Sequence, residues 1–173
     1  AVPGPASQDW RRSDGDGTQA LQVVGDMLGA LKRNNEGVEA MELPCYWHPR
    51  ASWYGPSGIG TGRGIRGFRE HHQIPFLDAM PDRRALMENG HFFGEGDYVG
   101  FTAWPGMAMT LSGGGWLGLP GSGQELTMRS LDFWRVEGDL IRENWVLVDL
   151  LDVYTQLGVD VFDRMRALPA WRG

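Results

Sequence analysis

The segment Arg142-Glu-Asn-Trp-Val-Leu-Val-Asp149, which continues into Leu150-Leu-Asp-Val-Tyr-Thr-Gln-Leu-Gly158, decides the fold of this chain. It predicts a final β-strand that ends in a carboxylate and leads into a short closing helix. Side-chain alternation would place Trp145 and Asp149 on one face of the strand and Asn144 on the other. A carboxylate at the end of a largely apolar strand can serve as a general base, because apolar surroundings raise its pKa. Asp is also a favoured helix N-cap, so the sequence leaves two roles open for Asp149.

Helices precede strands along the chain, which is the order of an α+β domain. Apolar side chains recur at three- and four-residue spacing from Thr18 onward and predict an amphipathic helix that ends near Asn34. Apolar runs bounded by Gly, Pro and Asp predict strands later in the chain. The expected helices cover residues 18–34, 36–43, 65–79 and 150–168, the last broken at Gly158, and the expected strands cover 51–54, 85–93, 98–109, 125–136 and 140–148.

Composition and charge narrow the classes of partner. The length of 173 residues, 42% of them hydrophobic, predicts a single domain over 18–173. Residues 1–17 are rich in Pro, Gly, Ser and Asp and predict a flexible arm. The net charge of −6 argues against nucleic acid and anionic membranes as partners. No signal-peptide or membrane-spanning pattern occurs, and Cys45 is the only cysteine. We therefore expect a cytoplasmic protein without an internal disulfide.

A glycine-rich run over residues 55–67 contains Gly62-Arg-Gly64-Ile-Arg-Gly67, which matches the dinucleotide pattern G-x-G-x-x-G by letter. A true fingerprint needs a buried strand directly before it and a second βαβ half after it, and this chain has neither. The run therefore predicts a loop and a turn that enter the helix expected at 65–79.

Asp132 is the second carboxylate of interest, because it lies inside the apolar run Leu131-Asp-Phe-Trp134. A charged residue among aromatics either faces solvent or is held in a pocket by a partner. Antiparallel pairing about the Glu137-Gly-Asp139 turn would bring Asp132 near Asn144 and Trp145. Alternation alone does not decide which face of this strand would line a cavity.

Three histidines could move a proton or polarise a carbonyl. His72 follows Phe68 by four positions, which places it on the apolar stripe of the expected helix, whereas His71 lies about 100° away around the axis. His91 falls in an expected strand. Each could equally be a structural histidine satisfied by a backbone carbonyl.

Eight tryptophans are many for a chain of this length, and some are expected to line a ligand cavity. The four histidines show no HExxH or H-x-H spacing, and one cysteine excludes sites with two thiolates, so no metal is expected. No G-x-S-x-G elbow for a nucleophilic serine is present. The expected ligand contacts are Trp53, His71, His91, Trp104, Trp134, Asn144 and Trp145.

Short motifs follow one another along residues 18–168. They are Gly64-Ile-Arg-Gly-Phe68, Phe76-Leu-Asp-Ala-Met-Pro-Asp82, Gly90-His-Phe-Phe-Gly-Glu-Gly-Asp97, and Trp145 with Asp149 and Gln156-Leu-Gly158. In this order and spacing they resemble the SnoaL-like polyketide cyclases of the nuclear transport factor 2-like superfamily. The resemblance implies a cone-shaped α+β barrel, in which N-terminal helices pack on a strongly curved, mostly antiparallel sheet. It also implies a homodimer formed through the outer face of that sheet.

The resemblance implies a chemistry as well. SnoaL-like cyclases close a ring by an intramolecular aldol condensation, with an Asp as general acid/base and no cofactor or metal. By its position before Gln156, that Asp corresponds to Asp149. The assisting histidine of the family lies on the strand before the last one, where this chain has Asp132 and no histidine. The expected catalytic set is therefore Asp149, Asp132 and His72.

These observations favour a cyclase-type protein that binds a small apolar carbonyl compound and acts by general acid/base catalysis. One alternative is another isomerase, a dehydratase or an epoxide hydrolase of the same fold. An alternative of a different class is a non-catalytic ligand-binding or dimerisation module, which a solvent-exposed Asp149 and a purely apolar cavity would favour. The sequence leaves open whether the protein is an enzyme.

Overall fold

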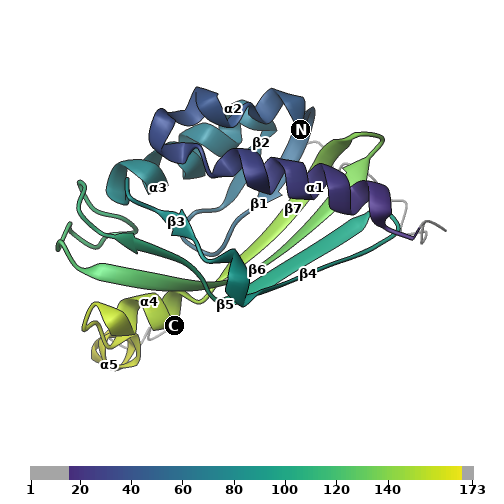
Figure 1. Ribbon diagram of the computed structural model, residues 1–173. Coiled ribbons are helices and arrows are strands. Elements are labelled where there is room, and N and C mark those ends of the chain that lie inside the picture. The colour runs from purple at the N-terminus through teal and green to yellow at the C-terminus, as the bar shows by residue number, and fades with distance from the viewer. Residues whose placement is uncertain (1–15, 169–173) are drawn as a thin grey trace, which may run out of the picture.

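A strongly bent sheet with helices against its concave side makes up the protein in the computed structural model, which describes residues 16–168 (Figure 1). Helices α1 to α3 cover the concave side, and α4 and α5 lie at one end of the sheet on its other side. Most of the predicted N-terminal arm, residues 1–15, lies outside the described residues.

The sheet has seven strands in the order β2-β1-β7-β6-β5-β3, and β4 also pairs with β5. Strands β1 and β7 are parallel, and the other neighbours are antiparallel. The α+β class and the curved, mostly antiparallel sheet are thereby confirmed. The strands are β1 (Trp47–Tyr54), β2 (Thr61–Arg63), β3 (Arg84–Ala85), β4 (Gly90–Glu95), β5 (Tyr98–Thr110), β6 (Glu125–Glu137) and β7 (Leu140–Val148).

The helices are short except for the first. Helix α1 buries Ala20, Val24 and Met27 at helical spacing against the sheet. The predicted helix over 65–79 is one helical segment whose middle turn, Arg69–Gln73, is a π-helix. No helix among residues 16–168 is long and apolar enough to cross a membrane. The α-helices are α1 (Thr18–Leu31), α2 (Gly64–Phe68), α3 (Ile74–Ala79), α4 (Leu150–Gln156) and α5 (Val161–Ala167).

Two expected elements are corrected by the structure. The helix expected over 36–43 is a series of short 3-10 turns, because Gly37 and Glu42 adopt positive φ angles of 102° and 48° and interrupt it. The strand expected over 85–93 is two strands, β3 and β4, separated by a 3-10 turn. Both pair with β5, on either side of an irregularity between Ala103 and Met107. Where β5 bends, its neighbour has to break.

The two faces of β6 differ in what they contact. Ser130, Asp132 and Trp134 face the helices and the interior, whereas Leu131 and Phe133 face outward. The register with β7 places Asp132 opposite Val146 and Trp134 opposite Asn144. The structure thus shows that the face of β6 with Ser130, Asp132 and Trp134 lines the cavity, a choice that alternation left open.

The glycine run leads into α2, as the sequence predicted, but its residues Thr61–Arg63 form strand β2 instead of a loop. A Cβ atom on Gly62 would lie 2.8 Å from the backbone of Phe68, and Gly64 has a φ of 63°. Gly67 in turn packs against Gly62. These glycines allow backbone to meet backbone, which is a packing role.

We expect Gly62→Ala to destabilise the fold by about 1–3 kcal/mol, the usual cost of an added methyl group without room. Gly29→Ala is the matched control, because it lies in α1 with open space around its Cβ position. This control should be neutral or stabilise by up to about 1 kcal/mol through helix propensity. Urea unfolding measures both, and a Gly62→Ala variant as stable as the wild type would contradict the packing role.

Candidate active site

A cavity of about 150 Å³ lies between the helices and the concave face of the sheet. Its lining is mostly aromatic and aliphatic, with residues from α1, from the α2–α3 segment and from β5, β6 and β7. A cavity of this size can hold a molecule with a single ring. The polar lining residues are Asn34, His72, Gln73, Arg83, Ser130, Asp132 and Asn144.

Asp132 provides the carboxylate of the cavity. It lies in the middle of β6 and lines the cavity. Burial raises the pKa of the Asp132 carboxyl to about 7, against the opposing effects of the Asn144 amide and the positive charge of Arg83. At neutral pH the group is therefore divided between acid and base forms, which suits proton transfer.

Asn144 is held by the neighbouring strand. Its side-chain nitrogen Nδ2 donates to the carbonyl oxygen of Phe133 at 3.0 Å, and the residue is buried. No hydrogen bond of ordinary geometry joins it to Asp132 among the described residues. Its amide dipole still favours the ionised carboxylate, although less than burial disfavours it.

His72 lies within the π-helical turn, and its ring stacks on Trp53 with centroids 4.3 Å apart and an interplanar angle of 12°. Phe68 and Phe76 flank the same ring. Burial, with a smaller effect of Arg83, lowers the pKa of His72 to about 4, so the imidazole is neutral at pH 7. Its Nδ1 atom has no hydrogen-bond partner among the described residues. Neutral His72 can shape the cavity or offer one hydrogen bond, but it brings no charge.

Arg83 is a cavity residue that the sequence interpretation missed. It precedes β3, and its charge is close enough to Asp132 for the two to influence each other's pKa. Burial lowers the pKa of the Arg83 guanidinium, but an arginine remains charged at neutral pH. Neighbouring Arg84 points outward and pairs with Glu125 at 2.8 Å. The sequence carried no signal for Arg83, because this residue precedes the strand and side-chain alternation does not apply to it.

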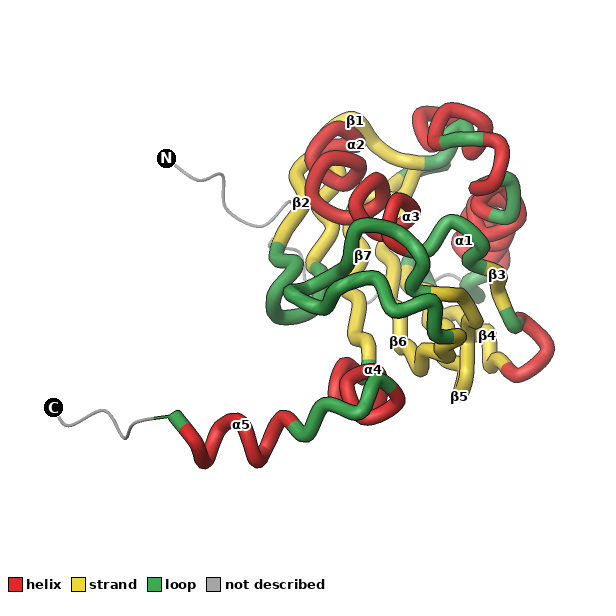
Figure 2. The backbone as a smooth tube through the Cα atoms, turned by 90° about the vertical axis from the view of Figure 1, so that its left-hand side faces the viewer, coloured by secondary structure: helices red, strands yellow, loops and turns green. Residues whose placement is uncertain are grey.

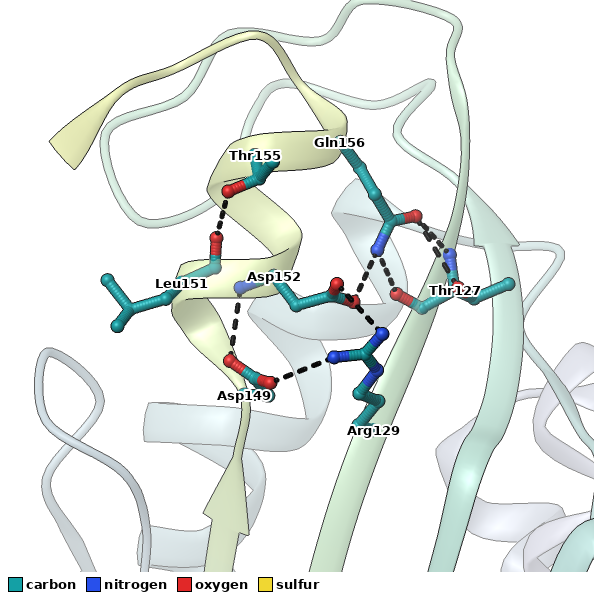
Figure 3. Close-up of polar contacts among 7 residues, drawn as sticks. All are labelled: Thr127, Arg129, Asp149, Leu151, Asp152, Thr155 and Gln156. Carbon is teal, nitrogen blue, oxygen red and sulfur yellow. Dashed lines mark hydrogen bonds and ion pairs between the residues drawn. The ribbon is translucent and has the colours of Figure 1, made fainter.

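Asp149 caps helix α4 (Figure 3). It is not among the residues that line the cavity. Its Oδ1 accepts a hydrogen bond from the backbone nitrogen of Asp152 at 3.0 Å, and its Oδ2 lies 3.4 Å from Nη1 of Arg129. Of the two roles that the sequence left open for Asp149, the geometry therefore supports the helix cap. The reason is strand parity, because Asp149 lies on the outward face together with Leu147.

Gln156 fastens the same helix to β6. Its Oε1 accepts from the backbone nitrogen of Thr127 at 2.9 Å, and its Nε2 donates to the Thr127 carbonyl oxygen at 2.9 Å (Figure 3). The Asp149 and Gln156 motif thus attaches α4 to the sheet.

The structure separates the other expected ligand contacts into two groups. Trp53, Trp134 and Asn144 line the cavity together with Asp132 and His72. The remaining contacts lie outside it because their positions face outward: His71 and His91 are exposed, Trp104 is 67% exposed with the Arg129 guanidinium above its ring, and Trp145 stacks on Tyr54.

Trp116, which lies between β5 and β6, also lines the cavity. The loop between β5 and β6 crosses one end of the molecule near α3 (Figure 2). Backbone nitrogens of Ser112 and Gly113 donate to the Ala79 carbonyl oxygen at 3.1 and 2.9 Å, which ties the loop to α3. Trp116 meets Phe76 edge-on with ring centroids 5.5 Å apart. The loop thereby supplies a wall of the cavity.

Within residues 16–168, no group of three or more His, Cys, Asp or Glu side chains is arranged to hold a metal ion.

A bent sheet closed by helices around a small cavity that contains a carboxylate is the architecture of nuclear transport factor 2-like α+β proteins. Residues 32–157 match the family model of the SnoaL-like polyketide cyclases, and the chain belongs to this family. A search of curated proteins gave no match.

Solved structures share the fold. IdmH from Streptomyces antibioticus, named as a candidate polyketide cyclase, is 24% identical over 78% of this chain and 98% of its own, with a TM-score of 0.61. A SnoaL-like protein from Jannaschia sp. CCS1 is 19% identical over 87% of this chain and 99% of its own, with a TM-score of 0.68. AclR from Streptomyces galilaeus, named as a candidate hydroxylase, is 16% identical over 87% of this chain and 98% of its own, with a TM-score of 0.59. At these identities the likeness concerns the fold.

The raised pKa of Asp132 predicts a specific dependence of stability on pH. Between about pH 4 and pH 7 the folded protein holds a proton on Asp132 that the unfolded chain has lost, so this group makes the protein less stable as the pH rises. From pH 5 to pH 8 the loss is on the order of 2 kcal/mol. The Asp132→Asn variant, which cannot titrate there, should lose less stability over this interval. Denaturant unfolding of both proteins at the two pH values measures the difference, and equal losses would refute the buried acid.

Proposed function

We propose that the protein is a cofactor-free acid/base enzyme of the cyclase type, in which Asp132 removes a proton next to a carbonyl group of a small apolar substrate. The observation that carries this proposal is a carboxylate with a pKa of about 7 in an aromatic cavity. A base is most effective when its pKa lies near the working pH. Loss of the proton creates an enolate, which can attack a second carbonyl of the same molecule and close a ring.

The aromatic lining supports an apolar ring as the part of the substrate that binds. Trp53, Trp134 and Trp116 line the cavity, and its volume fits a single ring better than a fused system. The same proton transfer would serve an isomerase or a dehydratase. An epoxide hydrolase with an Asp–Arg–Asp arrangement finds less support, because Arg129 and Asp149 meet outside the cavity. A silent binding module also finds less support, because the cavity contains two charges.

Exchange of α-protons tests the base. In D₂O the wild type should accelerate deuterium uptake into cyclohexanone, a small ketone with one ring, as followed by NMR. Asp132→Asn keeps the shape but removes the proton acceptor, so the rate should fall by about 10²–10⁴-fold.

Asp149→Asn is the matched control for this experiment, because Asn also caps helices and Asp149 lies outside the cavity. It should exchange like the wild type. Exchange that survives Asp132→Asn, or that is lost in Asp149→Asn, would assign the base elsewhere.

We also propose a homodimer formed through the outer face of the sheet. Apolar side chains form a continuous stripe there: the rings of Phe93 and Phe133 meet edge-on at 6.3 Å, Phe133 pairs with Trp145, and Leu131 pairs with Leu147. Phe93 and Leu147, at the two ends of this stripe, are 50% and 57% exposed, and an exposed stripe of large apolar residues marks an interaction surface. A second copy of the same stripe could cover it by two-fold symmetry. Cytoplasmic location remains a prediction of the sequence.

Light scattering should therefore give the mass of two chains at micromolar concentration, since a specific pair buries about 1,600 Å². Leu147→Lys places a charge in the stripe and should shift the protein toward one chain. Phe162→Lys on α5 is the control, because Phe162 is equally exposed (57%) but lies on a different element. A wild type of single-chain mass would contradict the dimer.

A further inference from the structure

Arg83 is an unpaired cation at the cavity. Five other arginines that are partly or fully buried each have a carboxylate partner: Arg33, Arg69, Arg129, Arg135 and Arg142. The Arg83 guanidinium has no hydrogen bond or ion pair with any of the described residues. Burying a charged group without a partner costs free energy of folding. Such groups are therefore found mainly at functional sites.

The backbone around Arg83 is held in place although its side chain is not. The Arg83 nitrogen donates to the Met80 carbonyl oxygen at 3.2 Å. The Arg83 carbonyl oxygen accepts from Nδ2 of Asn34, also at 3.2 Å. The guanidinium therefore extends into the cavity from a fixed point.

Arg83 and Asp132 line the same cavity and influence each other's pKa, but no ion pair of 4 Å or less joins them among the described residues. A ligand can therefore contact both groups at once, with one end at the carboxylate and the other at the guanidinium. Neither charge is neutralised by a direct contact before a ligand arrives.

We propose that Arg83 binds the carbonyl oxygen of the substrate and stabilises the negative charge that forms on this oxygen when Asp132 takes the neighbouring proton. This inference rests on the proposed function. In the step, the C–H bond breaks and its proton joins the Asp132 carboxylate. The electron pair of that bond forms the C=C bond of an enolate, and the π electrons of the carbonyl move to oxygen. The total charge of the cavity does not change, because Asp132 loses the negative charge that the oxygen gains.

Two other polar groups of the cavity, His72 and Asn144, are less suited to this role. His72 is neutral at pH 7 and carries no positive charge to attract an oxyanion. The strand in which the family's assisting histidine is expected contains none, and Asn144 already donates to Phe133. A guanidinium presents a planar fork of donors, which fits the in-plane lone pairs of an enolate oxygen. The preferred ligands are accordingly compounds that carry a negative oxygen on a flat ring.

4-Nitrophenol is a suitable probe, because its phenolate resembles an enolate on one small ring and its colour reports ionisation. The wild type should bind the phenolate form and shift the ionisation of the bound probe toward the anion. Arg83→Met should weaken phenolate binding by about 10- to 100-fold, which corresponds to one hydrogen bond to a charged group. Arg83→Lys should recover part of the affinity, and Asp132→Asn should strengthen phenolate binding, since it removes a negative charge.

4-Nitroanisole is the neutral control ligand, and its affinity should be the same in the wild type and in the Arg83 variants. In the cyclohexanone experiment, Arg83→Met should slow α-proton exchange by about 10²–10³-fold, which is typical of the loss of one donor to an oxyanion. If Arg83→Met does not fold, as judged by its circular dichroism, Arg83→Gln takes its place as the neutral variant.

The two proposals can fail separately. If Asp132→Asn abolishes exchange while the neutral Arg83 variants keep both phenolate affinity and exchange rate, Arg83 is not the oxyanion partner and the base stands. If phenolate binding depends on Arg83 but exchange survives Asp132→Asn, the anion site stands and the base is wrong. Equal loss of phenolate and 4-nitroanisole affinity in Arg83→Met would indicate a collapsed cavity and would also overturn the inference, unless Arg83→Lys restores the phenolate alone.

Discussion

A carboxylate on the concave face of a sheet loses most of its hydration, and the structure around Asp132 determines how that free-energy cost is met. The bend of the sheet and the helices above it create the enclosed space. Asn144 and Arg83 stabilise the charged form of Asp132, but by less than the loss of hydration destabilises it. The remainder appears as a raised pKa. Stability and reactivity are therefore opposed at this one side chain, because the burial that makes Asp132 a better base also makes the fold less stable at neutral pH.

Side-chain parity along β6 and β7 explains much of what the sequence could and could not predict. The long strands β5, β6 and β7, the helical segment with His72 and the break at Gly158 follow from local periodicity and turn residues, and the structure has them close to the expected positions. Local periodicity says that Asp132 and Trp134 share a face, but not that this face is concave. That choice depends on where the helices pack, which is a long-range property. The register shift in β5 between Ala103 and Met107 also interrupts the alternation of side chains there, which local periodicity did not predict.

The resemblance to a family was correct for the fold, but a motif can recur for a structural reason. Asp149 and Gln156 attach α4 to β6 through a helix cap and a pair of hydrogen bonds with Thr127. These contacts require the same residue types at the same spacing whether or not the protein is a catalyst. Arg83, in contrast, lies in a segment without periodicity, where only the folded chain shows which of two adjacent arginines faces inward.

The separation between Arg83 and Asp132 then becomes the central feature of the cavity. A direct ion pair would hold the carboxylate in its charged form and lower its pKa, by about 1–3 units for a close arginine, which makes a weak base. It would also occupy the guanidinium donors that an oxyanion needs. Without any cation, a buried carboxylate would be protonated through neutral pH and could not act as a base. The intermediate arrangement leaves Asp132 divided between its protonated and charged forms at pH 7. It also leaves Arg83 without a competing partner among the described residues. A ligand can therefore give its proton to Asp132 while its oxygen binds the Arg83 guanidinium.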